Sequence, residues 1–136
     1  MMLKRADKTQ HSPPDAGAFA IARREPDART SVISVEGELD LSTAPELKWT
    51  LLDAREAGHS RLVLDLSLCE FMDSTALGVL IGVNRSLDAG SRLAIVCPRA
   101  NVLKVFELSG LDGAFAIFRT LEEALAQAPQ SGAQAS

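Results

Sequence analysis

Strand-like and helix-like segments alternate along residues 18–127, and this alternation limits the possible folds more than any other feature of the chain. Five segments have strand-like patterns: 18–25, 30–39, 61–68, 91–98 and 114–118. Apolar residues take every second position in the first two, which flank the turn-forming sequence PDAR and predict a hairpin with one packed face. The third and fourth are more continuously apolar, as expected of central strands covered on both faces. The short fifth segment is predicted to be an edge strand.

Helix-like segments follow the second and each later strand: 43–58, 74–90, 99–110 and 120–128. Thr43 and Glu46 form a capping-box pattern at the first of them, and Pro45 falls in the first turn, where its missing N–H is not needed. Glycines stand where three of the helices are expected to stop, at positions 58, 90 and 110. This order predicts an α/β fold, with a mixed, mostly parallel sheet of about four to five strands and about four helices joined by right-handed crossovers.

The two ends of the chain differ from its middle in composition. Residues 1–17 and 128–136 are rich in Pro, Gly, Ser, Gln and Ala, and such segments bury too little surface to offset the entropy of ordering. We interpret both as flexible tails on a single domain, residues 18–127. A chain of 136 residues can bury a core without disulfide or metal support.

Composition excludes several classes of function. The chain is 46% hydrophobic and 24% charged, and it has neither an apolar run of membrane-spanning length nor a secretory signal pattern, so we expect a soluble cytoplasmic protein without membrane contacts. The formal net charge of −4 and the lack of a basic, aromatic-rich cluster disfavour nucleic acid as a direct partner. Cys69 and Cys97 lie beside apolar runs and are predicted to be buried, reduced thiols. With two histidines, two cysteines and no cluster of ligands, we expect no metal and no cofactor.

Three polar residues, Asp73, Ser74 and Thr75, interrupt the apolar sequence CEFMDSTALGVLIG. They follow a predicted central strand and begin the next helix, which is where open α/β sheets place their functional residues. Any of the three could cap the helix, but a cap requires one residue and not three. One interpretation is therefore a structural cap alone. The other is an exposed hydroxyl, Ser74, that accepts phosphate, since a phosphoserine is tolerated at the positive end of a helix dipole.

Two enzymatic interpretations are disfavoured. A serine nucleophile at Ser74 would need a base, but His59 precedes the same strand at its other end, about 20 Å away for a strand of that length, and the glycines of a nucleophile elbow are missing. An aspartyl-phosphate receiver, with Asp65 or Asp73 as acceptor and Lys104 as charge partner, would need adjacent acids to hold Mg²⁺. The acids of the second strand are instead spaced by glycine and leucine.

Gly78 and Gly82 are four residues apart in the helix after Ser74, so they share a face with Thr75 and Arg85. Each glycine costs about 1 kcal/mol in a helix interior relative to alanine, which calls for a packing reason. Two reasons remain open: close packing of this helix on its own sheet, or close approach of another chain.

Three stretches of the sequence resemble the STAS domain of bacterial anti-sigma factor antagonists: VISVEGELDLSTAPEL, LVLDLSLCEFMDSTALGVLIG and VLKVFELSGLDGAFAIFRTLEEAL. The resemblance covers about residues 17–127. It includes GELD before a helix with Pro-Glu, and Asp-Ser-Thr leading into a helix of leucines and glycines. It implies a STAS-like fold and an interaction module that is not an enzyme.

The resemblance also implies a cycle of partner switching. In such antagonists the serine after the aspartate, here Ser74, is phosphorylated by an anti-sigma factor that is itself a serine kinase, and a PP2C-type phosphatase removes the phosphate. The unphosphorylated form binds the anti-sigma factor and releases the sigma factor. Thr75 is a less favoured phosphorylation site. The predicted partner-binding residues are Asp40, Asp73, Ser74, Thr75, Gly78 and Gly82, with Asp40, the acid of GELD, expected beside Ser74.

The sequence departs from the family at Ala76, where glycine is usual. A methyl group at this position is expected to alter how closely a partner backbone approaches. An alternative function within the same fold is a STAS docking subunit of an ABC-transport or stress-sensing complex, without a phosphorylation cycle.

Overall fold

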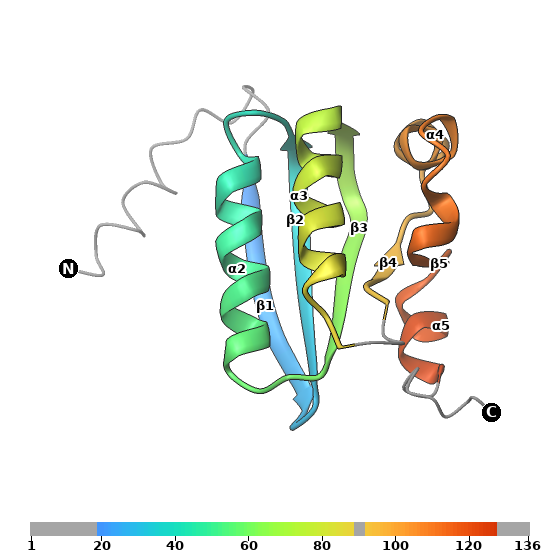
Figure 1. Cartoon of the computed structure of the whole chain (residues 1–136). Helices are drawn as coiled ribbons and strands as arrows, with labels where there is room; N and C mark the ends of the chain where they lie inside the picture. The colour runs from blue at the N-terminus through green and yellow to red at the C-terminus, as the bar shows by residue number, and fades with distance from the viewer. Residues whose placement is uncertain (1–18, 89–91, 128–136) are drawn as a thin grey trace.

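The computed structural model describes residues 19–88 and 92–127, and all five of its strands form one sheet in the order β1-β2-β3-β4-β5 (Figure 1). Strand β1 is antiparallel to β2, and the other neighbours are parallel. The elements are β1 (Ala20–Asp27), β2 (Thr30–Leu39), α2 (Ala44–Glu56), β3 (Arg61–Met72), α3 (Ser74–Arg85), β4 (Ala94–Val96), α4 (Ala100–Leu108), the 3-10 turn η1 (Asp112–Ala114), β5 (Ala116–Phe118) and α5 (Leu121–Ala126). The predicted α/β class, with its mixed and mostly parallel sheet, is confirmed.

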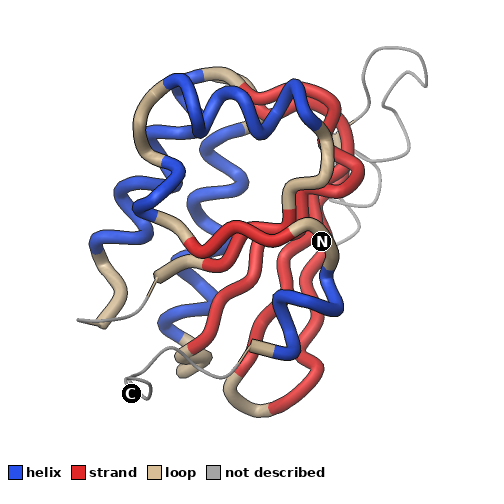
Figure 2. The backbone as a smooth tube through the Cα atoms, turned by 90° about the vertical axis from the view of Figure 1, so that its right-hand side faces the viewer, coloured by secondary structure: helices blue, strands red, loops and turns tan. Residues whose placement is uncertain are grey.

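One face of the sheet carries the main core. Helices α2, α3 and α4 pack on this face, and their apolar side chains meet those of β2 and β3 in a single buried cluster (Figures 1 and 2). The rings of Phe106 in α4 and Phe115 before β5 are in edge contact, with centroids 5.5 Å apart. Leu47, Leu64 and Leu80, from α2, β3 and α3, are fully buried there.

The other face is covered only in part. The short helix α5 packs Ala124 against a small cluster on β2, β3 and β4, and Arg61 donates a hydrogen bond to the carbonyl oxygen of Ala124. Beyond α5 this face of β3 is open: Leu68 is 57% exposed, and Asp65 is only half-buried. The prediction that segment 61–68 is covered on both faces is therefore correct only for its first half, because a helix of six residues reaches no further.

The helix ends confirm two predictions and correct one. Gly58 and Gly110 follow α2 and α4 with φ of +101° and +77°, as helix-ending glycines do, while Gly90 lies outside the described residues. Thr43 precedes α2, but its hydroxyl makes no capping bond to the helix. It donates to the carbonyl of Glu38 at 2.8 Å and accepts from the amide of Asp40 at 2.9 Å, so the predicted capping box is wrong. The predicted tails, 1–17 and 128–136, also lie outside the described residues.

Candidate functional site

Asp73, Ser74 and Thr75 lie where the sequence predicts, between the carboxyl end of β3 and the first turn of α3. Asp73 is the N-cap: its Oδ1 accepts hydrogen bonds from the amides of Thr75 at 2.9 Å and Ala76 at 3.1 Å. Ser74 and Thr75 are exposed, and neither hydroxyl makes a hydrogen bond to any described residue. Capping thus explains Asp73 alone, and two free hydroxyls remain beside it.

The loop after β2 lies next to this turn. Leu39 and Met72 are register partners in the parallel pair of β2 and β3, so Asp40 and Asp73 follow neighbouring strand ends. The amide of Asp73 donates to the carbonyl of Leu39 at 3.0 Å. The predicted neighbourhood of Asp40 and Ser74 is therefore formed by adjacent loops at one edge of the sheet.

Asp40 is held in a fixed position by its own loop. Its Oδ1 accepts from the amide of Ser42 at 2.9 Å and the hydroxyl of Ser42 at 2.8 Å, and from the amide of Thr43 at 3.2 Å. These hydrogen bonds lower the pKa of the Asp40 carboxyl, and the bond from the Ser42 hydroxyl has the largest effect. Burial of the carboxyl acts in the opposite direction. The site consequently presents a fixed carboxylate beside the hydroxyls of α3.

The glycines of α3 face solvent. Gly78 and Gly82 are exposed, as are Thr75 and Arg85 on the same side of the helix. A Cβ built on either glycine meets no atom within 4 Å. Close packing of this helix on its own sheet is thus excluded as the reason for the glycines, and the strip formed by Thr75, Gly78, Gly82 and Arg85 is open to another chain.

Ala76 faces the opposite way. Its side chain is fully buried in the main core with Leu77, Leu80 and Val83. The expectation that its methyl group would alter the approach of a partner backbone is wrong, because that methyl group contacts the core and not the surface.

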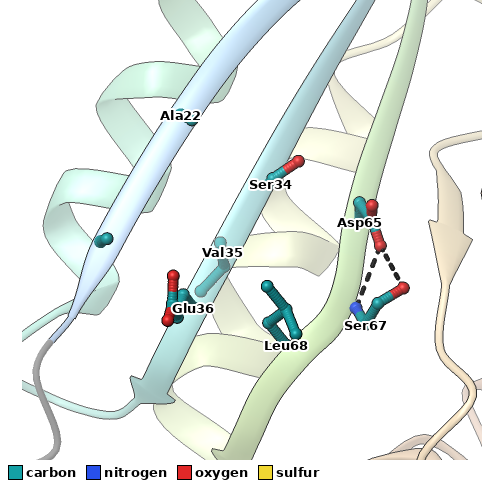
Figure 3. A pocket seen from close by; sticks show the side chains of 8 residues that line it. Ala22, Ser34, Val35, Glu36, Asp65, Ser67 and Leu68 are labelled. Atoms are coloured by element: carbon teal, nitrogen blue, oxygen red, sulfur yellow. Dashed lines mark hydrogen bonds between the residues drawn. The ribbon is translucent and has the colours of Figure 1, made fainter.

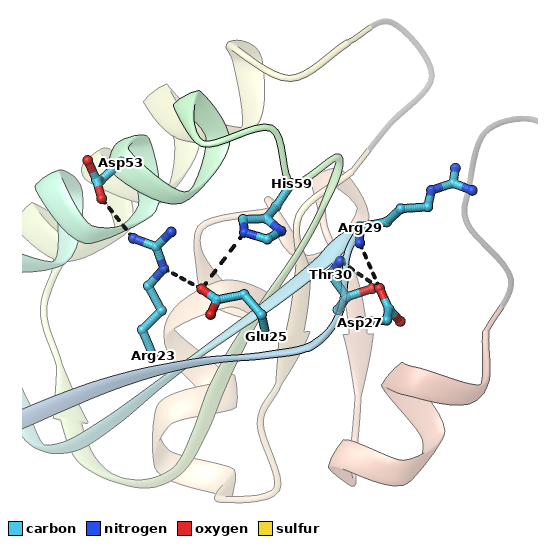
Figure 4. A network of polar contacts seen from close by, with 7 residues as sticks. All are labelled: Arg23, Glu25, Asp27, Arg29, Thr30, Asp53 and His59. Carbon is cyan, nitrogen blue, oxygen red and sulfur yellow. Dashed lines mark hydrogen bonds and ion pairs between the residues drawn. The ribbon is translucent and has the colours of Figure 1, made fainter.

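The histidine of the serine-nucleophile alternative is far from this turn. His59 lies at the opposite end of β3, with Nε2 3.8 Å from Glu25 Oε2 in a polar network that also contains Arg23 and Asp53 (Figure 4). The 12 residues of β3 place His59 about 36 Å from Ser74, further than the predicted strand implied. Ser74 and His59 therefore do not form a serine–histidine pair.

Asp65, a candidate acceptor of the receiver alternative, does not lie at a strand end. It is in the middle of β3 on the open face, and its Oδ1 accepts from the amide of Ser67 at 3.0 Å and from its hydroxyl at 2.6 Å (Figure 3). Within residues 19–88 and 92–127, no three His, Cys, Asp or Glu side chains are placed to hold a metal ion. The arrangement needed by a Mg²⁺-dependent receiver is therefore not formed by the described residues.

Two apolar residues beside the turn were missed by sequence reasoning. Leu41, directly after Asp40, is 72% exposed, and Phe71, two residues before Asp73, is 46% exposed. Exposed apolar and aromatic side chains are typical of the central part of protein interfaces. The sequence does contain one sign of this surface: Leu41 falls in a predicted loop, where an apolar residue contributes nothing to the core.

Exposed hydroxyls at a capped helix start, a fixed carboxylate and an open glycine strip define a small α/β interaction domain. The chain belongs to the STAS domain family, whose model matches residues 20–124. Family members of this kind are non-enzymatic regulators, in agreement with the prediction that the chain is not an enzyme. In the part of the chain that the structure describes, none of the helices has the length and apolar character needed to cross a membrane.

Several antagonists are similar to this chain. The anti-sigma-F factor antagonist RsfB of Mycobacterium tuberculosis is 32% identical over 95 residues, which is 70% of this chain and 78% of the relative. An anti-sigma factor antagonist from Mycobacterium paratuberculosis has a crystal structure with a TM-score of 0.74 and 31% identity, covering 84% of this chain and 95% of that one.

A third relative has been solved in two states. The unphosphorylated form of the anti-sigma factor antagonist SpoIIAA matches with a TM-score of 0.67 and 30% identity, over 78% of this chain and 93% of that one. The phosphorylated form of SpoIIAA from Bacillus matches with a TM-score of 0.61 and 28% identity, over 78% and 96%.

Proposed function

We propose that this chain is an anti-sigma factor antagonist that is switched by phosphorylation of Ser74. The observation that carries the proposal is the Ser74 hydroxyl, which is exposed at the first turn of α3 while Asp73 already occupies the cap. Similar proteins named as antagonists support the class of partner, and SpoIIAA, described in phosphorylated and unphosphorylated forms, supports the kind of switch.

The proposed cycle has two states and two enzymes. The unphosphorylated chain binds an anti-sigma factor that is a serine kinase, and the bound sigma factor is released. The kinase phosphorylates Ser74, which ends the complex, and a PP2C-type phosphatase restores the binding form. The cycle consumes ATP and acts on transcription, so it takes place in the cytoplasm.

The partner surface of this proposal combines the two loops with the open side of α3. It consists of Asp40, Asp73, Ser74, Thr75, Gly78 and Gly82. All but the half-buried Asp40 and Asp73 are exposed. Because the glycines lack side chains, a partner helix or loop could approach the backbone of α3 directly above Ser74.

A charge effect is large enough to operate this switch. A hundredfold loss of affinity requires about 2.7 kcal/mol. Phosphate adds roughly 1.5 to 2 negative charges, and two unit charges about 4 Å apart interact by about 4 kcal/mol at an effective dielectric near 20. One acidic partner group close to the phosphate therefore suffices, together with the bulk of the phosphate itself. The fold need not change, since Asp73 and not Ser74 supplies the cap.

The first test is phosphorylation of the purified chain by its cognate kinase and ATP, followed by peptide mass mapping. We expect one phosphate on Ser74, none on the Ser74→Ala variant, and full modification of Thr75→Ala. Phosphate confined to residues other than Ser74 and Thr75 would refute the assignment. No phosphate at all would favour the docking subunit of a transport or stress-sensing complex.

The second test separates the effect of a negative charge at position 74 from the effect of a change in the net charge of the chain. Ser74→Asp is expected to bind the anti-sigma factor at least tenfold more weakly than Ser74→Ala in calorimetric titrations. Gln127→Glu adds the same charge at an exposed position next to α5, on the other face of the sheet, and is expected to bind as the unmodified chain does. Equal affinities of the two Ser74 variants would contradict the electrostatic mechanism.

A further inference from the structure

Strand β1 ends the sheet on the side of α2, and its outer edge is free. Among the described residues, β1 pairs with β2 alone. Residues 20–24 pair in regular antiparallel register, whereas an irregularity and Pro26 interrupt the strand after Arg24. Bulges and prolines are features that keep edge strands from pairing with other chains. Residues 20–24 have neither feature, so their outward N–H and C=O groups can pair with a further strand.

A groove of about 530 Å³ lies beside this edge, where α2 packs over β1 (Figure 1). Its walls include Ile21 and Arg23 of β1 and Glu46, Trp49 and Asp53 of α2. Trp49 is 67% exposed, although tryptophan is typical of the residues that contribute most to binding at protein interfaces. A free strand edge next to a groove with an exposed tryptophan is the arrangement in which an added strand docks.

The sequence of β1 fits an antiparallel copy of itself. With a two-fold axis at Ala22, this residue faces its own copy, and the two exposed methyl groups allow the strands to approach closely. Ile21 then faces Arg23, and Ala20 faces Arg24. Directly opposite positions therefore carry no pair of like charges, which would destabilise the pairing. Hydrogen-bonding groups alternate along a strand, and this register aligns them whichever of the two sets points outward.

Opposite charges also meet across this axis. Arg24 of the second copy would lie beside Ala20, whose neighbour on β2 is Glu36. The backbones of the arginine and the glutamate are then about 10 Å apart, twice the spacing of adjacent strands, and their long side chains can span this distance. On the other side of the sheet, Arg23 of the second copy would enter the groove that Glu46 lines. The occupant that fits this edge is therefore a second copy of the same chain.

We propose that two copies of this chain pair through β1, antiparallel and about a two-fold axis at Ala22, so that their two sheets become one. The strand of each copy covers Trp49 of the other. Helix α3 lies next to α2 and further from this edge, so Ser74 and the glycine strip stay accessible in both copies (Figure 1). The dimer is independent of the phosphorylation of Ser74.

Sedimentation velocity of the full chain, from about 1 μM to about 1 mM, measures the association directly. We expect a monomer–dimer equilibrium within this range. Trp49 is the only tryptophan of the chain, so its fluorescence reports on the same contact. As the dimer forms, the emission maximum should move to shorter wavelength and quenching by acrylamide should weaken. A chain that stays monomeric over the whole range, or a dimer with unchanged Trp49 emission, would overturn the proposal.

Charges placed at the axis test the register. Ala22 is exposed, so Ala22→Arg and Ala22→Glu should both fold, which circular dichroism checks. Each variant brings two like charges face to face and is expected to dimerise at least tenfold more weakly than the unmodified chain. An equal mixture of the two variants should dimerise again, because opposite charges then face each other across the axis.

Ala28→Arg and Ala28→Glu are the matched controls. They add the same charges at an exposed position in the turn after β1, beyond the residues that pair. Both should dimerise as the unmodified chain does. Dimerisation that neither Ala22 variant weakens, or a mixture of the two that stays monomeric, would overturn the proposal.

Discussion

The backbone amide of Asp73 donates a hydrogen bond to the carbonyl oxygen of Leu39 at 3.0 Å, which ties the turn before α3 to the end of β2. Asp40 follows Leu39 directly, so this bond fixes the spacing between the two acidic loops of the site. The side chain of Asp73 meanwhile holds the first turn of α3. One residue thus positions Ser74 relative to both its helix and the neighbouring loop.

Replacing Asp73 by alanine removes both capping bonds of α3. We expect the free energy of unfolding to fall by about 1 kcal/mol, the usual cost of losing an N-cap side chain. Urea unfolding measures this loss as a lower midpoint at an unchanged slope. Asp73→Asn is the matched control, because an asparagine oxygen can accept the same bonds from Thr75 and Ala76. Equal losses in the two variants would show that charge, and not the cap, accounts for the effect.

Alanine in place of Gly78 or Gly82 is expected to change stability and binding in opposite directions. Each substitution should raise the free energy of unfolding by up to about 1 kcal/mol, because alanine favours the helix and its Cβ meets no neighbouring atom. The same methyl group would weaken anti-sigma factor binding if the partner contacts this strip. Thermal unfolding and titration calorimetry on the same samples separate the two effects.

Gly110→Ala is the control of opposite sign. Gly110 has φ of +77°, which strains any residue with a Cβ, so this variant should lose stability without losing affinity. Unchanged affinity in Gly78→Ala and Gly82→Ala would remove the glycine strip from the proposed interface and leave the two loops and Ser74.

The position of Ser74 could be predicted from the sequence because two periodicities meet there. An apolar strand pattern ends at Met72, and a helical pattern begins two residues later. The burial of Ala76 was also visible in principle, since Ala76, Leu80 and Val83 recur on one helical face. This spacing, and not the glycine that is usual in the family, decides where the methyl group of Ala76 lies.

Other features depend on contacts that are distant in the sequence. Segment 61–68 has the composition of a strand buried on both faces, but whether it is covered depends on the length of α5, some fifty residues later. The capping-box prediction at Thr43 is wrong for a local reason. The Thr43 hydroxyl forms hydrogen bonds with the backbone of Glu38 and Asp40 in the loop, and it makes none with the amides of the helix. Periodicity predicts the helices and strands. The length of a distant helix decides whether a strand face is covered, and the hydrogen bonds of a loop decide which residue caps a helix.

The Asp40 loop should contribute to stability in a pH-dependent way. Its carboxyl has a lowered pKa in the folded protein, so its contribution is present above the pKa of the unfolded chain and is lost as the pH falls through the lower, folded value. Asp40→Asn keeps an oxygen that can accept from Ser42 but cannot titrate. We expect this variant to lose less stability than the unmodified chain between about pH 5 and pH 2.

Urea unfolding at several pH values over this range measures the difference. Asp112→Asn is a matched control, because it removes an exposed carboxylate that accepts no hydrogen bond from the described residues. Parallel curves for Asp40→Asn and the unmodified chain would contradict the contribution assigned to this loop.

The two thiols should be unreactive as long as the fold is intact. Cys69 and Cys97 are buried in the core; burial raises the pKa of both, that of Cys97 to about 11, and the thiolate is the form that reacts with iodoacetamide. At pH 8 we expect labelling of the folded chain to be at least about 100-fold slower than in concentrated urea. An added exposed cysteine, Ala126→Cys, supplies the rate for a free thiol in the folded protein. Cys69 lies near the end of β3, before the turn that Asp73 caps. Faster labelling of Cys69 alone in Asp73→Ala would therefore locate the damage of that variant at the end of β3. Labelling of the folded chain as fast as that of Ala126→Cys would contradict the burial of both thiols.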